Sequence, residues 1–167
     1  NTDEWEYWQP EYRYGAFYIF PPDDVLDLIG ALRKKYDPKS DNICPAHISL
    51  SEPLQQPLTG ELLAEIQKSV ERFDPFEMIY GPIITFPPHP GVCFEVRPAD
   101  RFFDLRGKLN TCSVFCGSDL SRKSIAPHIT IAEFGLTFDE SEELKTKLNK
   151  TVKGGSFFCA SIEYAVP

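Results

Sequence analysis

The stretch Pro45-Ala46-His47-Ile48-Ser49-Leu50 recurs in outline as Pro127-His128-Ile129-Thr130-Ile131. Each copy consists of a histidine, an apolar residue, a hydroxyl residue and a second apolar residue, and the second histidine lies 81 positions after the first. Because side chains alternate between the two faces of a β-strand, the histidine and the hydroxyl residue of each copy share one face. The two apolar residues of each copy then anchor the strand in the core, and the polar pair faces a cleft or water.

A single His-x-Thr pattern on a strand is only weak evidence of a functional site. It often arises by chance, and it is typical of a half-buried histidine whose ring nitrogens have hydrogen-bond partners. The repetition favours a functional interpretation, because two of the three histidines in the chain occupy the same pattern, each shortly after a proline. If the two halves of the chain pack about a pseudo-two-fold axis, His47 and His128 flank one substrate, one as a base and the other as an acid. Ser49 and Thr130 then bind the non-bridging oxygens of a phosphate. His89 lies in a proline-rich turn outside this pattern, and we expect it at the surface.

Hydrophobic periodicity predicts one domain over residues 14–167, preceded by an aromatic and acidic arm over residues 1–13. The arm holds Trp5, Tyr7 and Trp8, which either pack on the domain itself or bind a partner. Predicted strands cover residues 14–20, 46–51, 76–86, 92–97, 126–134 and 156–166. Predicted helices cover residues 22–35, 59–72, 99–112 and 139–150, and Asp37-Pro38 is expected to end the first of them. Helices interleave with strands but hairpins also occur, so the pattern indicates the α+β class.

Composition excludes several classes of protein. A net charge of −8 argues against a protein that coats long duplex nucleic acid, but salt limits such fields to about 8 Å, so a small nucleotide or an RNA end is still allowed. No stretch approaches the roughly 20 apolar residues of a membrane-spanning helix. The five cysteines are scattered, and we expect them to be reduced in a cytoplasmic protein. Cys112 and Cys116 form a C-x3-C pattern, but without a second pair or a nearby histidine they predict no metal site.

The paired stretches around His47 and His128 resemble the two H-x-T/S-x signatures of the 2H phosphoesterase superfamily, which includes LigT-like and 2′-5′ RNA ligase-like proteins. The likeness covers about residues 13 to 166, because the opening strand also runs into a helix ahead of the first motif, as in small bacterial members. The resemblance implies a bilobal α+β fold whose lobes are related by a pseudo-two-fold axis, with antiparallel sheets lining a central cleft and helices outside. It also implies His47 and His128 as catalytic residues, Ser49 and Thr130 as substrate-binding residues, and no metal or other cofactor.

Two features depart from the pattern of that superfamily. Ser49 stands where threonine is more common; it keeps the hydroxyl donor, but its χ1 angle is less restricted. The negative net charge is unfavourable for binding RNA, so basic groups near the site would have to compensate. Arg122 and Lys123, shortly before His128, are the best candidates by sequence proximity, and the alternative interpretation is a solvated loop.

Three hypotheses about function follow from these observations. The first is a metal-independent phosphodiesterase that opens a cyclic phosphate or cleaves a 2′-linked phosphodiester of a nucleotide or RNA end. The second is a non-catalytic module that binds nucleotides or RNA ends in the same cleft, although binding alone does not need two titrating groups. The third is a scaffold that binds a partner through the aromatic arm. We expect a monomer without a membrane partner, and the sequence leaves open the substrate and which histidine is the base.

Overall fold

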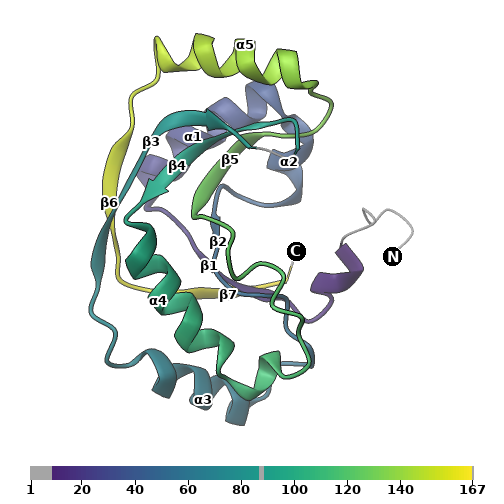
Figure 1. Cartoon of the computed structure of the whole chain (residues 1–167), viewed down its shortest axis with the longest axis vertical. Coiled ribbons are helices and arrows are strands. Elements are labelled where there is room, and N and C mark those ends of the chain that lie inside the picture. The colour runs from purple at the N-terminus through teal and green to yellow at the C-terminus, as the bar shows by residue number, and fades with distance from the viewer. Residues whose placement is uncertain (1–8, 87–88, 167) are drawn as a thin grey trace.

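A computed structural model describes residues 9–86 and 89–166 of the chain, and it consists of two antiparallel β-sheets with five α-helices (Figure 1). The first sheet has the order β2-β1-β7 and the second the order β5-β4-β3-β6. Antiparallel sheets with interleaved helices confirm the predicted α+β class. The strands are β1 (Ala16–Ile19), β2 (Ile48–Ser49), β3 (Phe76–Thr85), β4 (Val92–Arg97), β5 (His128–Ala132), β6 (Gly155–Cys159) and β7 (Glu163–Ala165). The helices are α1 (Asp23–Tyr36), α2 (Pro38–Ile43), α3 (Gly60–Val70), α4 (Ala99–Asn110) and α5 (Phe138–Asn149), with short 3-10 turns at Gln9–Tyr12 and Ser113–Phe115.

The helix ends follow from local capping chemistry. The Thr59 side chain accepts a hydrogen bond from the backbone N–H of Leu62 and caps α3, as the sequence indicates. Helix α5 begins one residue earlier than predicted, because Thr137 and Glu140 form a reciprocal capping box in front of it. Caps of this kind satisfy backbone groups that would otherwise have no partner inside the helix.

The segment after α1 differs from the prediction. Helix α1 ends at Tyr36, as expected, but Pro38 does not lead into a loop; it opens the short helix α2. The reason is that proline fits the first turn of a helix, while the side chain of Asp37 accepts a hydrogen bond from the backbone N–H of Ser40. As a result a short helix, and not a loop, precedes residues 44–46, which lead to His47.

The predicted single strand over residues 156–166 is wrong. This segment forms β6, which pairs with β3 in the second sheet, and then β7, which pairs with β1 in the first sheet. The chain passes from one sheet to the other at residues 160–162, and the strand is interrupted there because its two parts pair with strands of different sheets. The end of the chain therefore ties the two sheets together.

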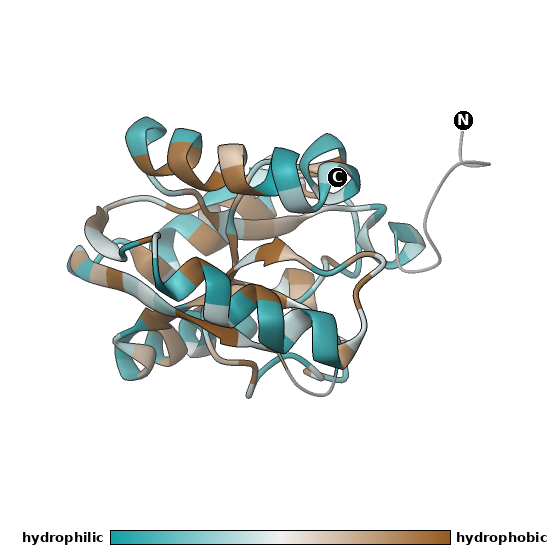
Figure 2. Cartoon of the chain, turned by 90° about the horizontal axis from the view of Figure 1, so that it is seen from above, coloured by the Kyte–Doolittle hydropathy of each residue, from teal (hydrophilic) through white to brown (hydrophobic). Residues whose placement is uncertain are grey.

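One apolar core joins both sheets. Helix α1 packs on β5 and α5 packs on β3, while α3 and α4 pack against each other. The helices turn hydrophilic faces outward, as Figure 2 shows by the teal bands on their outer sides. Strand β2, which directly follows His47, and strand β5, which begins at His128, are edge strands of the two sheets and lie close together (Figure 1). Within residues 9–86 and 89–166, no helix is both long and apolar enough to cross a membrane.

Candidate functional site

Strands β2 and β5 present the two motifs in the orientation that the alternation predicts. Ile48, Leu50, Ile129 and Ile131 are fully buried, whereas the histidine and hydroxyl residues between them keep part of their surface. Because both strands place their apolar residues in one core, the polar residues of both motifs are left facing outward from it. The expected strand faces are therefore confirmed for both motifs.

Each imidazole is held in the same way. Nδ1 of His47 lies 2.8 Å from the carbonyl oxygen of Pro45, and Nδ1 of His128 lies 2.8 Å from the carbonyl oxygen of Ala126. A carbonyl oxygen can only accept, so Nδ1 carries the proton in both rings, and Nε2 of the neutral ring keeps its lone pair. The thiol of Cys44 lies 3.6 Å from Nδ1 of His47 and fills the same side of that ring. The two imidazoles therefore share one tautomer, with the proton on Nδ1 and the lone pair on Nε2.

Aromatic rings support both imidazoles. The ring of Phe86 lies 4.2 Å from that of His128, and the rings of Tyr18 and Phe20 lie 4.9 Å and 6.1 Å from that of His47. Phe20 and Phe86 each precede two prolines in the sequence, at the ends of β1 and β3. This repeated Phe-Pro-Pro was a signal in the sequence that could have identified both aromatic supports, and our sequence analysis missed it.

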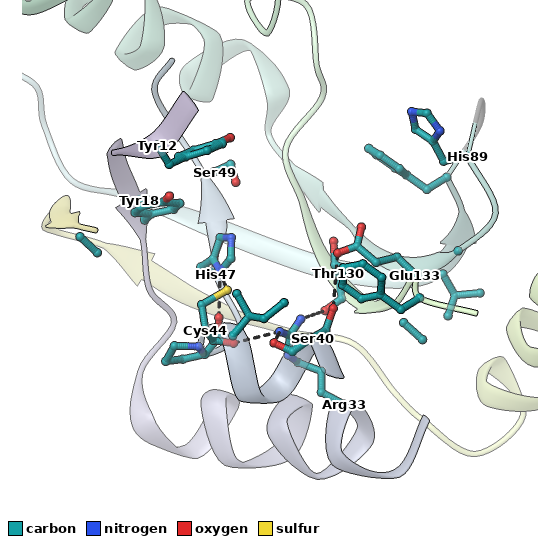
Figure 3. Close-up of a pocket in the computed structure, with 18 of the residues that line it drawn as sticks. Tyr12, Tyr18, Arg33, Ser40, Cys44, His47, Ser49, His89, Thr130 and Glu133 are labelled. Atoms are coloured by element: carbon teal, nitrogen blue, oxygen red, sulfur yellow. Dashed lines mark hydrogen bonds between the residues drawn. The ribbon is translucent and has the colours of Figure 1, made fainter. Parts of the chain in front are cut away.

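A cavity of about 640 Å³ opens beside these motifs (Figure 3). His47, Ser49 and Thr130 line it, so the structure brings three of the four predicted site residues to one space. His128 is not among the lining residues, but it packs on Phe86, which is. His128 is also close enough for its positive charge to lower the pKa of His47. A cavity of this size is in the range that holds small ligands.

The cavity also contains residues that the motifs did not indicate. Of the two basic candidates, Arg122 lines the cavity, with its guanidinium carbon 5.2 Å from the centre of the Tyr12 ring, whereas Lys123 is exposed and outside the lining. His89 is exposed, as expected, yet it lines the cavity as well. Tyr12 falls in the predicted arm but is buried beside β1, while Trp5, Tyr7 and Trp8 lie outside the described residues.

Three further polar residues, Arg33, Ser40 and Glu133, also line the cavity. Glu133, which follows β5, lies with its carboxylate Oε1 3.4 Å from the hydroxyl of Ser40 on α2 (Figure 3). Burial raises the pKa of Glu133, with the charge of Asp37 as the next cause. Arg33, near the end of α1, is buried and lines the cavity.

The surroundings keep both imidazoles neutral near pH 7. Burial lowers the pKa of His47 to about 4; the hydrogen bond to Pro45 opposes this effect, and the charges of Arg33 and His128 reinforce it. Burial also lowers the pKa of His128, and Arg106 adds to the effect. A neutral imidazole is a base, and the binding of an anion such as a phosphate would favour protonation of either ring.

Within the described part of the chain, no three His, Cys, Asp or Glu side chains gather in the manner of metal ligands. All five cysteines are free thiols; Cys112 is buried and Cys116 is exposed. The described structure therefore directs attention to the cavity beside β2 and β5.

The sequence was also compared with those of known proteins. The sequence profile described as the 2′-5′ RNA ligase superfamily matches residues 21–163, a range that includes both histidine motifs. A protein of Oceanobacillus iheyensis is 31% identical over 139 residues, which cover 81% of this chain and 78% of that protein. A protein of Bacillus cytotoxicus is 26% identical over 118 residues, which cover 69% of this chain and 66% of that protein. Both relatives carry the name "putative phosphoesterase".

Proposed function

The chain belongs to the 2′-5′ RNA ligase superfamily, and from that premise we propose that it is a phosphodiesterase that uses two histidines for acid–base catalysis. Its proposed substrate is a cyclic phosphate or a 2′-linked phosphodiester of a nucleotide or an RNA end. One observation carries the proposal: each motif holds its imidazole by a hydrogen bond from Nδ1 to the carbonyl two residues earlier, so that each Nε2 can exchange a proton. The names of the two relatives support the same class of reaction.

The proposed reaction needs one proton acceptor and one proton donor. Nε2 of the neutral histidine removes a proton from water while the water oxygen attacks phosphorus. The bond between phosphorus and the ribose oxygen breaks on the opposite side, and the protonated histidine gives its proton to that oxygen. Each proton transfer is worth roughly 10²–10⁴ in rate. The cycle ends with the two protonation states exchanged, and exchange with water restores them.

The pKa values of the two imidazoles support an assignment of roles. Burial lowers the pKa of His47 to about 4, and the charge of a protonated His128 adds to this effect, so we expect His47 to be the neutral ring when one of the two carries a proton. We therefore assign His47 as the base and His128 as the acid in the hydrolytic direction. Ser49 and Thr130 donate hydrogen bonds to the non-bridging oxygens, because their side chains share the faces of the two histidines.

The lining of the cavity suits a nucleoside attached to that phosphate. Tyr18, Phe20, Phe86 and Phe134 offer aromatic surface on which a base can stack. Arg122 supplies a positive charge in the cavity of a protein whose net charge is −8, which helps a phosphate to bind despite the overall charge.

Hydrolysis of a substrate panel in EDTA tests the proposed function. The panel contains the four 2′,3′-cyclic nucleotides, a 2′-5′ oligoadenylate and ADP-ribose cyclic phosphate, with products identified by mass and chromatography. We expect turnover of at least one substrate at an unchanged rate in EDTA, because an imidazole pair can supply both proton transfers. Loss of turnover in EDTA that a divalent ion restores would contradict the two-histidine chemistry. Binding of these nucleotides without any turnover would favour a non-catalytic binding module.

Removal of the hydroxyl groups should affect turnover but not folding. We expect Ser49→Ala and Thr130→Ala each to lower kcat by about 10²-fold, because one oriented donor to the phosphate is lost. Ser51→Ala is the matched control, since the buried hydroxyl of Ser51 instead accepts from the backbone N–H of Phe17 and donates to the carbonyl of Glu52. This control should lower the melting temperature more than the other two variants. Unfolding of Ser49→Ala or Thr130→Ala would contradict the assigned strand faces.

A further inference from the structure

Four charged side chains are buried within the described part of the chain, and all four lie where the two motifs meet. Arg33, Asp37, Glu52 and Arg106 are each only 1–3% exposed. Burial of a charge is costly unless hydrogen bonds compensate it. In this protein the compensating partners are mainly backbone groups of the motif strands and of the loops that lead into them.

The first brace consists of Arg33 and Asp37, which precede the first motif. Arg33 donates from Nη1 to the carbonyl of Thr130 at 2.9 Å, and from Nη2 to the carbonyls of Ser40 at 2.7 Å and Cys44 at 2.9 Å. The carboxylate of Asp37 accepts from the backbone N–H groups of residues 133 and 134 at 2.9 Å and 3.0 Å. The segment before His47 is therefore fastened to the strand that carries His128.

The second brace consists of Arg106 and Glu52 and makes the reciprocal connection. Arg106 donates from Nε to the carbonyl of Leu50 at 2.7 Å and from Nη2 to that of Ser49 at 3.0 Å. Its Nη1 donates to the carbonyls of residues 122 and 125 at 2.8 Å and 2.7 Å. Glu52 accepts from the backbone N–H of Arg122 at 2.7 Å. The segment before His128 is therefore fastened to the strand that carries His47.

The two braces follow the same plan. In each, an arginine binds the carbonyl of the hydroxyl residue of one motif and two carbonyls in the segment that precedes the other motif. In each, a carboxylate accepts hydrogen bonds across the same junction, Asp37 from two backbone N–H groups and Glu52 from one. We infer that the two braces fix the distance and orientation between the two histidine motifs, so that Arg33, Asp37, Glu52 and Arg106 are positioning residues for the proposed phosphodiester cleavage.

A role in stabilising the fold does not by itself explain which carbonyl groups the two arginines bind. If the buried charges served only to neutralise one another, the arginines would pair chiefly with the buried carboxylates. They instead donate to the backbone carbonyls of Thr130 and Ser49, the two residues proposed to hold the phosphate. Arg33 also contributes to the lowered pKa of His47, and Arg106 to that of His128. Each brace therefore acts on one imidazole through its charge and on both motifs through its hydrogen bonds.

The inference rests on the proposed function, and Arg33→Lys and Arg106→Lys test it. Lysine keeps the charge but loses the planar fork that reaches several carbonyls at once. Arg101→Lys is the matched control on α4, because Arg101 donates to the carbonyl of Asp74 and lies over Phe73, away from the motifs. For both brace variants we expect kcat to fall about 100-fold with KM within about threefold, since a displacement of about 1 Å suffices for such a loss. The control variant should keep both constants.

Nitrogen-15 NMR of the imidazoles supplies a readout that a purely structural role would not move. Arg33→Met should raise the pKa of His47 alone, and Arg106→Met that of His128 alone. Brace variants with lowered melting temperatures but unchanged kcat, tautomers and pKa values would overturn the inference.

Amide hydrogen exchange in the unaltered protein tests the same inference without any substitution, so a variant that does not fold leaves the inference testable. We expect the amides of Arg122, Glu133 and Phe134 to exchange as slowly as those of the core strand β4, because the braces hold them. Fast local exchange at these amides would overturn the inference. Absence of turnover with every substrate of the panel would contradict the proposed function instead, while the NMR and exchange results would still decide whether the braces hold the motifs.

Discussion

His47→Ala and His128→Ala are each expected to lower kcat/KM by about 10³-fold, and the double variant should be scarcely worse than the more damaged single variant. The reason is that an acid without its base contributes little to a concerted displacement at phosphorus. The measurement is kcat/KM for the unaltered protein, both single variants and the double variant on the best substrate of the panel.

His89→Ala provides a matched control for this comparison. His89 lines the same cavity but is exposed, and its ring is held by neither motif. We expect its replacement to change kcat/KM by less than about tenfold, since it removes at most a peripheral contact with the ligand. If the losses from His47→Ala and His128→Ala instead multiply in the double variant, the two histidines do not serve one reaction.

The rate should be greatest in mildly acidic solution. In the free protein the base must be neutral and the acid protonated, and the surroundings lower both pKa values below the ordinary value of about 6.5. The acidic limb of kcat/KM therefore lies near the pKa of His47, about 4, because protonation of His47 removes the base. The alkaline limb lies below about pH 6.5, because deprotonation of His128 removes the acid.

The measurement is kcat/KM and kcat across about pH 4 to 8, with circular dichroism at each pH to confirm that the protein is folded. Above the alkaline limb kcat/KM should fall about tenfold per pH unit. The profile of kcat should extend to higher pH, since a bound phosphate stabilises the protonated ring. A maximum of kcat/KM above about pH 7 would contradict the assigned protonation states.

The parts of the structure that follow from local physics could be predicted from the sequence. Alternation placed Ile48 and Ile129 in the core and the two histidines on the opposite faces, because a strand permits no other arrangement. The hairpin of β3 and β4 and the cap at Thr59 likewise depend on nearby residues. The site could be located for the same reason, since each motif is complete within four residues.

The parts that depend on distant contacts could not be predicted in this way. The crossing from β6 to β7 is decided by which sheet has a free edge, and that edge belongs to β1 or β3, far away in the sequence. The buried position of Arg33 could not be predicted, because its partner Thr130 lies 97 positions further on in the sequence. The sequence also has a glutamate five residues after each motif histidine, at Glu52 and Glu133. This repeat could be connected with the site only when the contact between β2 and β5 was known.

If both imidazoles contact one phosphate, a nucleoside 2′-monophosphate should affect both rings at once, and an NMR titration with that nucleotide measures this. The imidazole nitrogens are followed by nitrogen-15 NMR at about pH 6. Both histidines of the free protein have pKa values below the ordinary value of about 6.5. We predict that the Nε2 signals of His47 and His128 shift together with a single Kd, while those of His89 move less. A shift of only one of the two rings, or two different Kd values, would contradict the claim that one phosphate lies between them.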